Sequence, residues 1–238
     1  MLKPYAGNLP TSTVKKGNTG ENVKRVQTFL NWCIGFDLVV DGICGTKTVN
    51  AIKKFQVRYG LKKDGIFGVK SLAMAKYLIK MQPLYAAMKA QYEWSKNQKY
   101  KFNKHPTVEN SKKEGSCITF VAVTCQRLGI LPIGKYFYLN PDTNRIAGNG
   151  DDYVKKHTEL YKVTYPNKTI EQLWKDGKLK IYDMIGFDDP AYHSMFFGGF
   201  NSKGNPIFYS MGSKKKWGKT YPYYANRKVG MIVRIKGV

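Results

Sequence analysis

The chain has 238 residues, enough for one large domain or two small ones, and 42% of them are hydrophobic, which excludes a disordered chain. Forty Lys and Arg against 16 Asp and Glu give a formal net charge of +24. Because this excess is spread along the whole chain, we expect an extended polyanion as the partner. Nucleic acid, an anionic membrane surface and an anionic cell wall all fit that description.

From the sequence we expect neither a membrane-spanning stretch nor a secretory signal. No segment approaches the ~20 consecutive apolar residues of a transmembrane helix, and the first residues lack a basic segment followed by an apolar one. The four cysteines, Cys33, Cys44, Cys117 and Cys125, are too few for a disulfide scaffold in a chain of this length. We therefore expect at least one of them to carry chemistry.

The first 80 residues contain an internal repeat, in which residues 62–71 follow the pattern of residues 39–48. Each copy has an Asp-Gly pair that predicts a tight turn, a second glycine, and a Thr or Ser near a helix start. Apolar residues at helical spacing precede each turn: Val23, Val26, Phe29 and Leu30 before the first, and Val49, Ile52 and Phe55, with Gln56, before the second. The repeat predicts a module of three helices joined by two D-G-x-x-G turns.

These patterns resemble the peptidoglycan-binding domain of bacterial and phage wall hydrolases. The matching positions run from Gly17 through the Val-x-x-Val-Gln of the first helix to Gly68, and they cover about residues 13–78. Cys44 stands where the family usually has an aromatic residue. The resemblance implies that residues 1–80 form a domain that binds wall peptide or glycan. An unrelated three-helix bundle with two similar turns is the alternative.

Beyond residue 80 the predicted helices come before the predicted strands. A helix over 79–98 would place Leu84, Met88, Gln91, Tyr92 and Ser95 on one face, with Pro83 in its first turn or just before it. Further helices are predicted at 117–128 and at about 151–161. Strands are predicted around 180–187, 193–199, 206–211 and 229–236. This order predicts an α+β domain over residues 81–238.

A cysteine stands at the predicted start of helix 117–128. Ser116 suits the N-cap position, and the free N–H groups and dipole of a helix start favour an anion. We therefore expect the pKa of the Cys117 thiol to fall. Cys125, two turns further on, is interpreted as a buried small hydrophobic residue. Cys117 is the candidate nucleophile, and a structural thiol at a helix start is the alternative.

A thiol nucleophile needs a base, and the sequence has three histidines. His105 lies in a Lys-rich loop and His157 follows two lysines, so both are predicted at the surface. His193 opens an apolar run over residues 195–200 and can take the Cys117 proton if that strand abuts the cysteine's helix. A core histidine with a satisfied hydrogen bond is the alternative.

Cysteine at a helix start, histidine at a strand start and a hairpin together resemble the papain-like, NlpC-type cysteine peptidases of the bacterial wall. The resemblance covers about residues 84–236. Tyr100-x-Phe102 matches a Tyr-x-aromatic pattern upstream of the family nucleophile, which implies that Tyr100 lines the substrate site. Ser116 stands where the family has an acidic residue before the cysteine. Ile118 and Thr119, the two residues after the cysteine, also differ from the family pattern, which indicates a divergent, phage-like branch. The cysteine/histidine-dependent amidohydrolases share this architecture.

A third residue should orient the imidazole through its other nitrogen. If Phe200 pairs with Asn205 in the hairpin, Ser210 shares a strand face with His193, whereas a slip of one residue presents Tyr209 there. We predict Ser210 as the third member of the site. Asp183 matches a family position that we interpret as structural.

The sequence as a whole predicts a phage endolysin-like peptidoglycan endopeptidase that is made in the host cytoplasm and acts at the cell wall. Its expected partners are peptidoglycan and anionic wall polymers, not nucleic acid, and no oligomeric state is predicted. The run of lysines and aromatics at 214–224 suits such a wall, although it also suits single-stranded nucleic acid or a solvated loop. Zinc and phosphate-loop motifs are absent, so we expect no catalytic metal and no cofactor. The alternatives are an N-acetylmuramoyl-L-alanine amidase and a non-catalytic wall-binding or nucleic-acid-binding protein.

Overall fold

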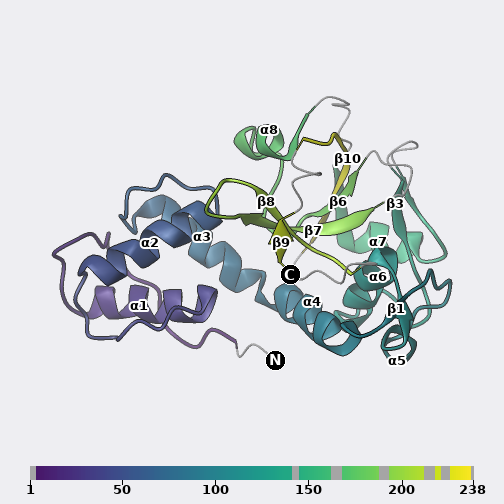
Figure 1. The fold of residues 1–238 in the computed structure, drawn as a ribbon, viewed down its shortest axis with the longest axis horizontal. Helices are drawn as coiled ribbons and strands as arrows, with labels where there is room; N and C mark the ends of the chain where they lie inside the picture. Colours follow the sequence, from purple (N-terminus) through teal and green to yellow (C-terminus); the bar gives the residue numbers. More distant parts are fainter. Residues whose placement is uncertain are drawn as a thin grey trace. The chain divides into compact units, whose positions relative to one another are not determined.

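The computed structural model describes residues 4–140, 145–161, 168–187, 193–211, 218–220 and 226–236. The chain divides into two compact units, one comprising Leu2–Gln82 with Phe200–Gly204, the other Pro83–Gly199 with Asn205–Val238 (Figure 1). Helices dominate the first half of the chain and a six-stranded sheet the second, so the protein is α+β, as predicted. None of the helices in the described ranges is long and apolar enough to cross a membrane.

The first unit contains three helices, α1 (Glu21–Ile34), α2 (Thr46–Arg58) and α3 (Val69–Lys80), which confirms the predicted three-helix module. The apolar faces expected on α1 and α2 are buried, apart from the partly exposed Val49. At the centre the ring of Phe29 packs against Phe55 and Phe67, with centroids 5.6 and 5.9 Å apart. These aromatic contacts hold both helices against the chain that follows the second turn.

The second unit contains the remaining helices, and α6 begins at the cysteine that the sequence singled out. Their bounds are α4 (Gln82–Ser95), α5 (Val108–Ser111), α6 (Cys117–Arg127), α7 (Asp151–His157) and α8 (Ile170–Lys175). The helix predicted over 151–161 is wrong beyond His157. There the chain becomes strand β5 (Thr158–Tyr161), whose backbone pairs with a distant strand instead of continuing the helix.

The main sheet has six strands in the order β5-β10-β6-β7-β8-β9. Besides β5 these are β6 (Met184–Phe187), β7 (Ser194–Phe200), β8 (Pro206–Tyr209), β9 (Lys219–Thr220) and β10 (Val229–Ile235). The four strands predicted from apolar runs are therefore present, within a few residues at their ends. Two short pairs were not predicted, the parallel β1 (Lys99–Tyr100) and β2 (Glu114–Gly115), and the antiparallel β3 (Tyr138–Asn140) and β4 (Arg145–Ala147).

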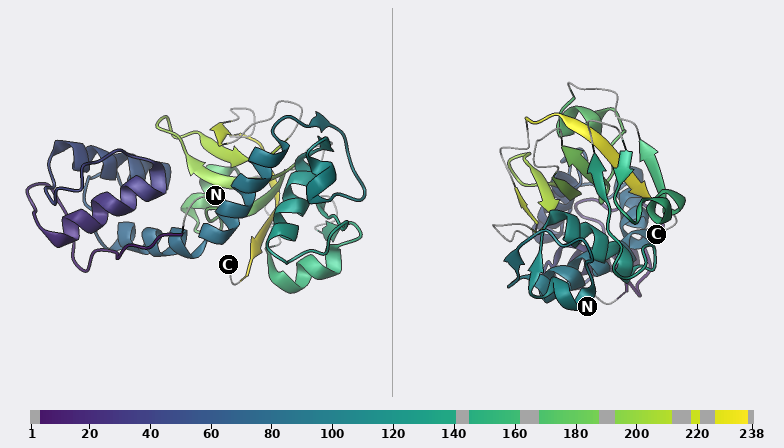
Figure 2. Two further views of the ribbon diagram at one scale, coloured as in Figure 1. Left: turned by 90° about the horizontal axis from the view of Figure 1, so that it is seen from below. Right: turned by 90° about the vertical axis from the view of Figure 1, so that its right-hand side faces the viewer.

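Helices cover both faces of the sheet (Figure 2). The ring contacts of two successive β7 residues show which helix covers which face. Phe196 packs against Phe120 of α6, with ring centroids 6.3 Å apart. Phe197 packs against Trp174 of α8 at 5.6 Å. Because successive side chains of a strand point to opposite faces, α6 and α8 lie on opposite sides of the sheet. Every residue of β7 is buried as a result.

A buried ion pair holds the start of β6. The carboxylate of Asp183 accepts hydrogen bonds from Arg234 of β10 at 2.8 and 2.7 Å, and another from the backbone N–H of Lys180 at 2.7 Å. Burial raises the pKa of Asp183 above its ordinary value, and Arg234 opposes that shift. The backbone carbonyl of Asp183 accepts a hydrogen bond from the N–H of Phe197 at 2.9 Å. All these contacts are internal, in agreement with a structural role for Asp183.

Candidate functional site

The start of α6 has the local geometry that the sequence predicts for a nucleophile helix. Ser116 is the N-cap, and its hydroxyl accepts a hydrogen bond from the backbone N–H of Thr119 at 3.3 Å. Cys117 is the first residue of the helix. Strand β2, which ends at Gly115, leads into this cap and pairs with β1, so the chain on both sides of the cysteine is held by hydrogen bonds.

The sulfur of Cys117 is enclosed where α6 meets the sheet, and the side chain is 3% exposed. Burial raises the pKa of the Cys117 thiol above its ordinary value, while hydrogen bonds from the backbone N–H groups of Ser194, Ile118 and Cys117 itself lower it. The net direction is upward, so the expected fall is wrong for the free protein. Desolvation of the thiolate outweighs the favourable helix start. The thiol therefore stays protonated at neutral pH until a base removes its proton.

Among the histidines, His193 lies next to the residue that faces Cys117. The backbone N–H of Ser194 acts to lower the pKa of the Cys117 thiol, and His193 directly precedes Ser194 at the start of β7. The backbone carbonyl of His193 accepts a hydrogen bond from the N–H of Phe187 at 3.4 Å, and His193 is partly buried. The fold thus brings the backbone at the start of β7 near the start of α6. By alternation His193 shares the strand face of Phe197, which α8 covers, so its imidazole must turn toward α6 to reach Cys117.

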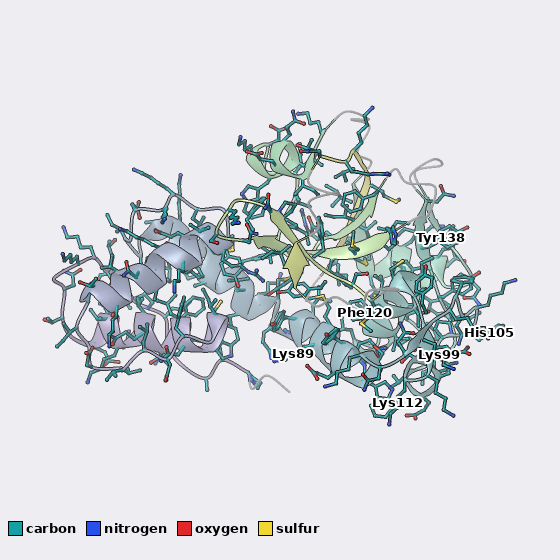
Figure 3. All side chains as sticks on the ribbon, viewed as in Figure 1. Lys89, Lys99, His105, Lys112, Phe120 and Tyr138 are labelled. Atoms are coloured by element: carbon teal, nitrogen blue, oxygen red, sulfur yellow. The ribbon has the colours of Figure 1, made fainter. Side chains whose placement is uncertain are left out.

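The other two histidines are exposed, as predicted. His105 lies in the loop after β1, at the outer edge of the second unit, whereas Phe120 of α6 points into its core (Figure 3). His157 ends α7. Neither residue lies in the buried region around Cys117.

Tyr100 on β1 lies close to the cysteine. Burial raises the pKa of the Tyr100 hydroxyl above its ordinary value, and the nearby charge of a Cys117 thiolate raises it further. The rest of the side chain is open to solvent, with 55% of the residue exposed. Tyr100 is therefore a largely exposed residue near the Cys117 thiol, a position from which it can contact a substrate.

Ser210 directly follows β8 and is 5% exposed. Its hydroxyl donates to the backbone carbonyl of Met211 at 3.4 Å. Tyr209 packs over Gly198, whereas Phe208 packs on Phe197, so Tyr209 lies on the strand face opposite to that of Phe197. This excludes the alternative pairing of β7 and β8, shifted by one residue, because that pairing would have put Tyr209 on the same strand face as Phe197. The orienting role of Ser210 stays a prediction.

The two turns of the first unit are built around buried glutamines. The Nε2 of Gln27 donates to Asp41 Oδ1 at 2.8 Å and to the backbone carbonyl of Ile43 at 3.2 Å, while its Oε1 accepts from the N–H of Gly42 at 3.0 Å. We call this arrangement the glutamine clamp. It links the middle of α1 to all three residues of the turn.

The second turn repeats the clamp bond for bond. Gln56 donates to Asp64 Oδ1 at 2.7 Å and to the carbonyl of Ile66 at 2.9 Å, and it accepts from the N–H of Gly65 at 2.8 Å. The sequence pattern predicts Gln56 only as part of an apolar helix face, and it did not predict the bonds of Gln56 to the turn. A glutamine directly after an apolar core residue, Val26 or Phe55, in the helix before each Asp-Gly pair was the available signal.

The clamps leave apolar side chains exposed around the two turns. Five large hydrophobic residues of the first unit are at least 39% exposed: Val39, Val40, Ile43, Ile66 and Val69. They lie beside or within the turn segments, which are also rich in lysine. This surface of apolar side chains and cations is the candidate contact face of the first unit.

No group of three or more His, Cys, Asp or Glu residues in the described ranges is placed to hold a metal ion. All four cysteines are free thiols, and burial raises the pKa of Cys33 and of Cys125 to about 12. Most of the basic and aromatic run at 214–224 lies outside the described residues. Cys117, His193 and Tyr100 therefore make up the candidate site of the second unit, with Ser210 as its predicted fourth member.

Comparison with known proteins concerns the first unit. Residues 19–74 match the family described as "Putative peptidoglycan binding domain". The N-terminal domain of SleB is similar in structure to 31% of this chain over its own full length, with 30% sequence identity and a TM-score of 0.29.

Two proteins of Bacillus licheniformis are similar in sequence over 41 residues, 17% of this chain. One, named "Probable N-acetylmuramoyl-L-alanine amidase", is 51% identical, and the other, "N-acetylmuramoyl-L-alanine amidase CwlL", is 49% identical. The similar region spans only 12% and 11% of these two relatives.

Proposed function

Because its N-terminal unit carries a peptidoglycan-binding domain, we propose that this chain is a peptidoglycan hydrolase that cuts an amide bond of the wall peptide with a cysteine nucleophile. The proposal rests chiefly on one observation, the placement of Cys117. It is the buried first residue of a capped helix, and the backbone N–H groups of Ser194, Ile118 and Cys117 act to lower the pKa of its thiol. The NlpC-like assignment of the second unit is part of this proposal.

Cys117 is the proposed nucleophile and His193 its base. Since the free thiol is protonated at neutral pH, the His193 imidazole takes the proton as the sulfur attacks the carbonyl carbon of the amide. Backbone N–H groups at the start of α6 stabilise the oxyanion that forms. The C–N bond then breaks, and the imidazolium returns the proton to the leaving nitrogen. A thioester on Cys117 remains.

Water completes the cycle. His193 takes a proton from the water, whose oxygen attacks the thioester carbonyl. The C–S bond breaks, the imidazolium returns its proton to the Cys117 sulfur, and the new carboxylic acid leaves and releases its own proton to solvent. Ser210 is the proposed residue that orients the imidazole, and Tyr100 the proposed contact to the bound peptide. The peptidoglycan-binding domain would keep the second unit at a high local concentration of its substrate.

Mass spectrometry of the fragments released from purified cell walls tests this function. Wild-type protein should release fragments that Cys117→Ala does not release. Cys125→Ala is the matched control, because Cys125 lies on the same helix and is equally buried. That variant should keep the activity of its folded fraction. Equal release by wild type and Cys117→Ala would overturn the cysteine mechanism.

The masses of the released fragments also show which bond of the wall is cut. New amino termini within the stem peptide identify an endopeptidase. Release of intact stem peptides identifies an amidase acting between muramic acid and L-alanine, and the two Bacillus relatives named as such amidases favour testing this second candidate. No fragments from wild type, with the protein still pelleting with walls, would identify a wall-binding protein without this activity.

A further inference from the structure

Gln98 lies buried beside the start of α6. It directly precedes β1, and β1 pairs with the strand that leads into the Ser116 cap. The residue is 1% exposed. A Cβ atom on Gly115 would lie 2.8 Å from the Gln98 Oε1 and 3.2 Å from Thr119 Cγ2. The carboxamide therefore sits against the backbone just before Cys117 and next to the first turn of its helix.

Both polar atoms of this carboxamide are unpaired. Among the described residues, four buried side-chain nitrogen or oxygen atoms have no hydrogen-bond partner: Gln98 Nε2, Gln98 Oε1, Ser194 Oγ and Gln126 Oε1. Three of the four belong to residues near the start of α6 or at the start of β7: the two Gln98 atoms lie on a side chain beside Gly115, and Ser194 is the first residue of β7. Burying an unpaired polar group lowers stability, so such a cluster calls for an explanation.

The other buried glutamines show that this protein ordinarily satisfies such groups. Gln27 and Gln56 form the glutamine clamps. Gln91 donates to Ser111 Oγ at 2.8 Å and accepts from Arg127 at 3.0 Å. Gln98, as buried as Gln91 and in the same unit, is the only described residue with an entire buried carboxamide left unpaired.

We propose that Gln98 recognises the substrate by hydrogen bonding to one peptide group of the wall peptide, next to the bond that Cys117 attacks. This inference rests on the proposed function. A peptide group presents one donor and one acceptor, and the carboxamide offers the complementary acceptor and donor. Cys117 itself is only 3% exposed. A substrate that reaches its sulfur must displace the atoms that cover it, and the Gln98 carboxamide lies against Gly115, two residues before Cys117.

Replacing Gln98 by methionine separates a role in substrate binding from a role in stability, because methionine has a similar length and no carboxamide. Peptide binding is measured by calorimetry in the inactive Cys117→Ala protein, with disaccharide-peptide fragments prepared from purified walls by a muramidase. Adding Gln98→Met should weaken binding about 10- to 100-fold, as expected for the loss of two hydrogen bonds. Its melting temperature should be unchanged or higher, because two unpaired buried atoms are removed.

Gln91→Met in the same background is the matched control. It should lower the melting temperature, since it leaves Arg127 and Ser111 without their partner, and it should leave the affinity unchanged. Equal affinity with and without Gln98→Met would overturn the inference, as would a complete lack of fragment binding. Because this assay measures binding in an inactive protein, failure of the hydrolytic function appears separately, as wild-type protein that releases no fragments.

Discussion

A thiol enclosed between a helix and a sheet differs chemically from one that meets solvent. In the free protein, burial raises the pKa of Cys117 despite three nearby N–H donors. We therefore expect its alkylation by iodoacetamide to follow a pH curve with a midpoint above that of free cysteine, which is about pH 8.5. Peptide mapping by mass spectrometry at pH 6 to 10 gives this midpoint for Cys117.

The midpoint is the informative quantity, because enclosure slows alkylation at every pH. Urea-unfolded protein is the control and should follow the curve of free cysteine. A plateau already reached below pH 8 would contradict the prediction and would indicate a thiolate held by His193 before substrate binds.

Turns and helices are coupled in the first unit through the glutamine clamps. Replacing Gln56 by Leu should lower the free energy of unfolding by about 1–3 kcal/mol, because the Gly65 N–H loses its partner in a buried position and the part-buried Ile66 carbonyl keeps only its bond from Ser71. Urea denaturation of the full chain measures this change. Asn50→Ala, at an exposed position of the same helix, should stay within about 0.5 kcal/mol. A similar effect of both substitutions would contradict the importance of the clamp.

Elements with strong periodicity were predictable from the sequence, and short or distant pairings were not. The apolar spacing of α1 and α2 identifies each helix, because burial follows the helical repeat. Strands β1 to β4 have two or three residues each and depend on their partners, so local sequence carries little information about them. The pKa of Cys117 was missed for a similar reason. The sheet that encloses the thiol comes from residues far along the chain.

On the scale of the whole molecule, both halves are basic, and the net charge is +24. We expect the fraction of protein that pellets with purified walls to fall as NaCl rises from about 50 to 500 mM, because salt screens attraction to anionic wall polymers. Walls stripped of their phosphate polymers by hydrofluoric acid are the control. On these walls the salt dependence should be weak, and the remaining binding should reflect the peptidoglycan-binding domain. Salt-independent binding to untreated walls would contradict the prediction.

The two glutamine clamps enclose loops of different length. Gln27 and Asp41 are 14 residues apart, whereas Gln56 and Asp64 are 8 apart, yet the bonds are the same. The additional residues follow the end of α1 at Gly35 and are fastened by Asn31, which bonds both the N–H and the carbonyl of Leu38. The same clamp therefore forms with two loops whose lengths differ by six residues. We expect an insertion directly after Gly35, before the residue that Asn31 fastens, to leave both turns intact.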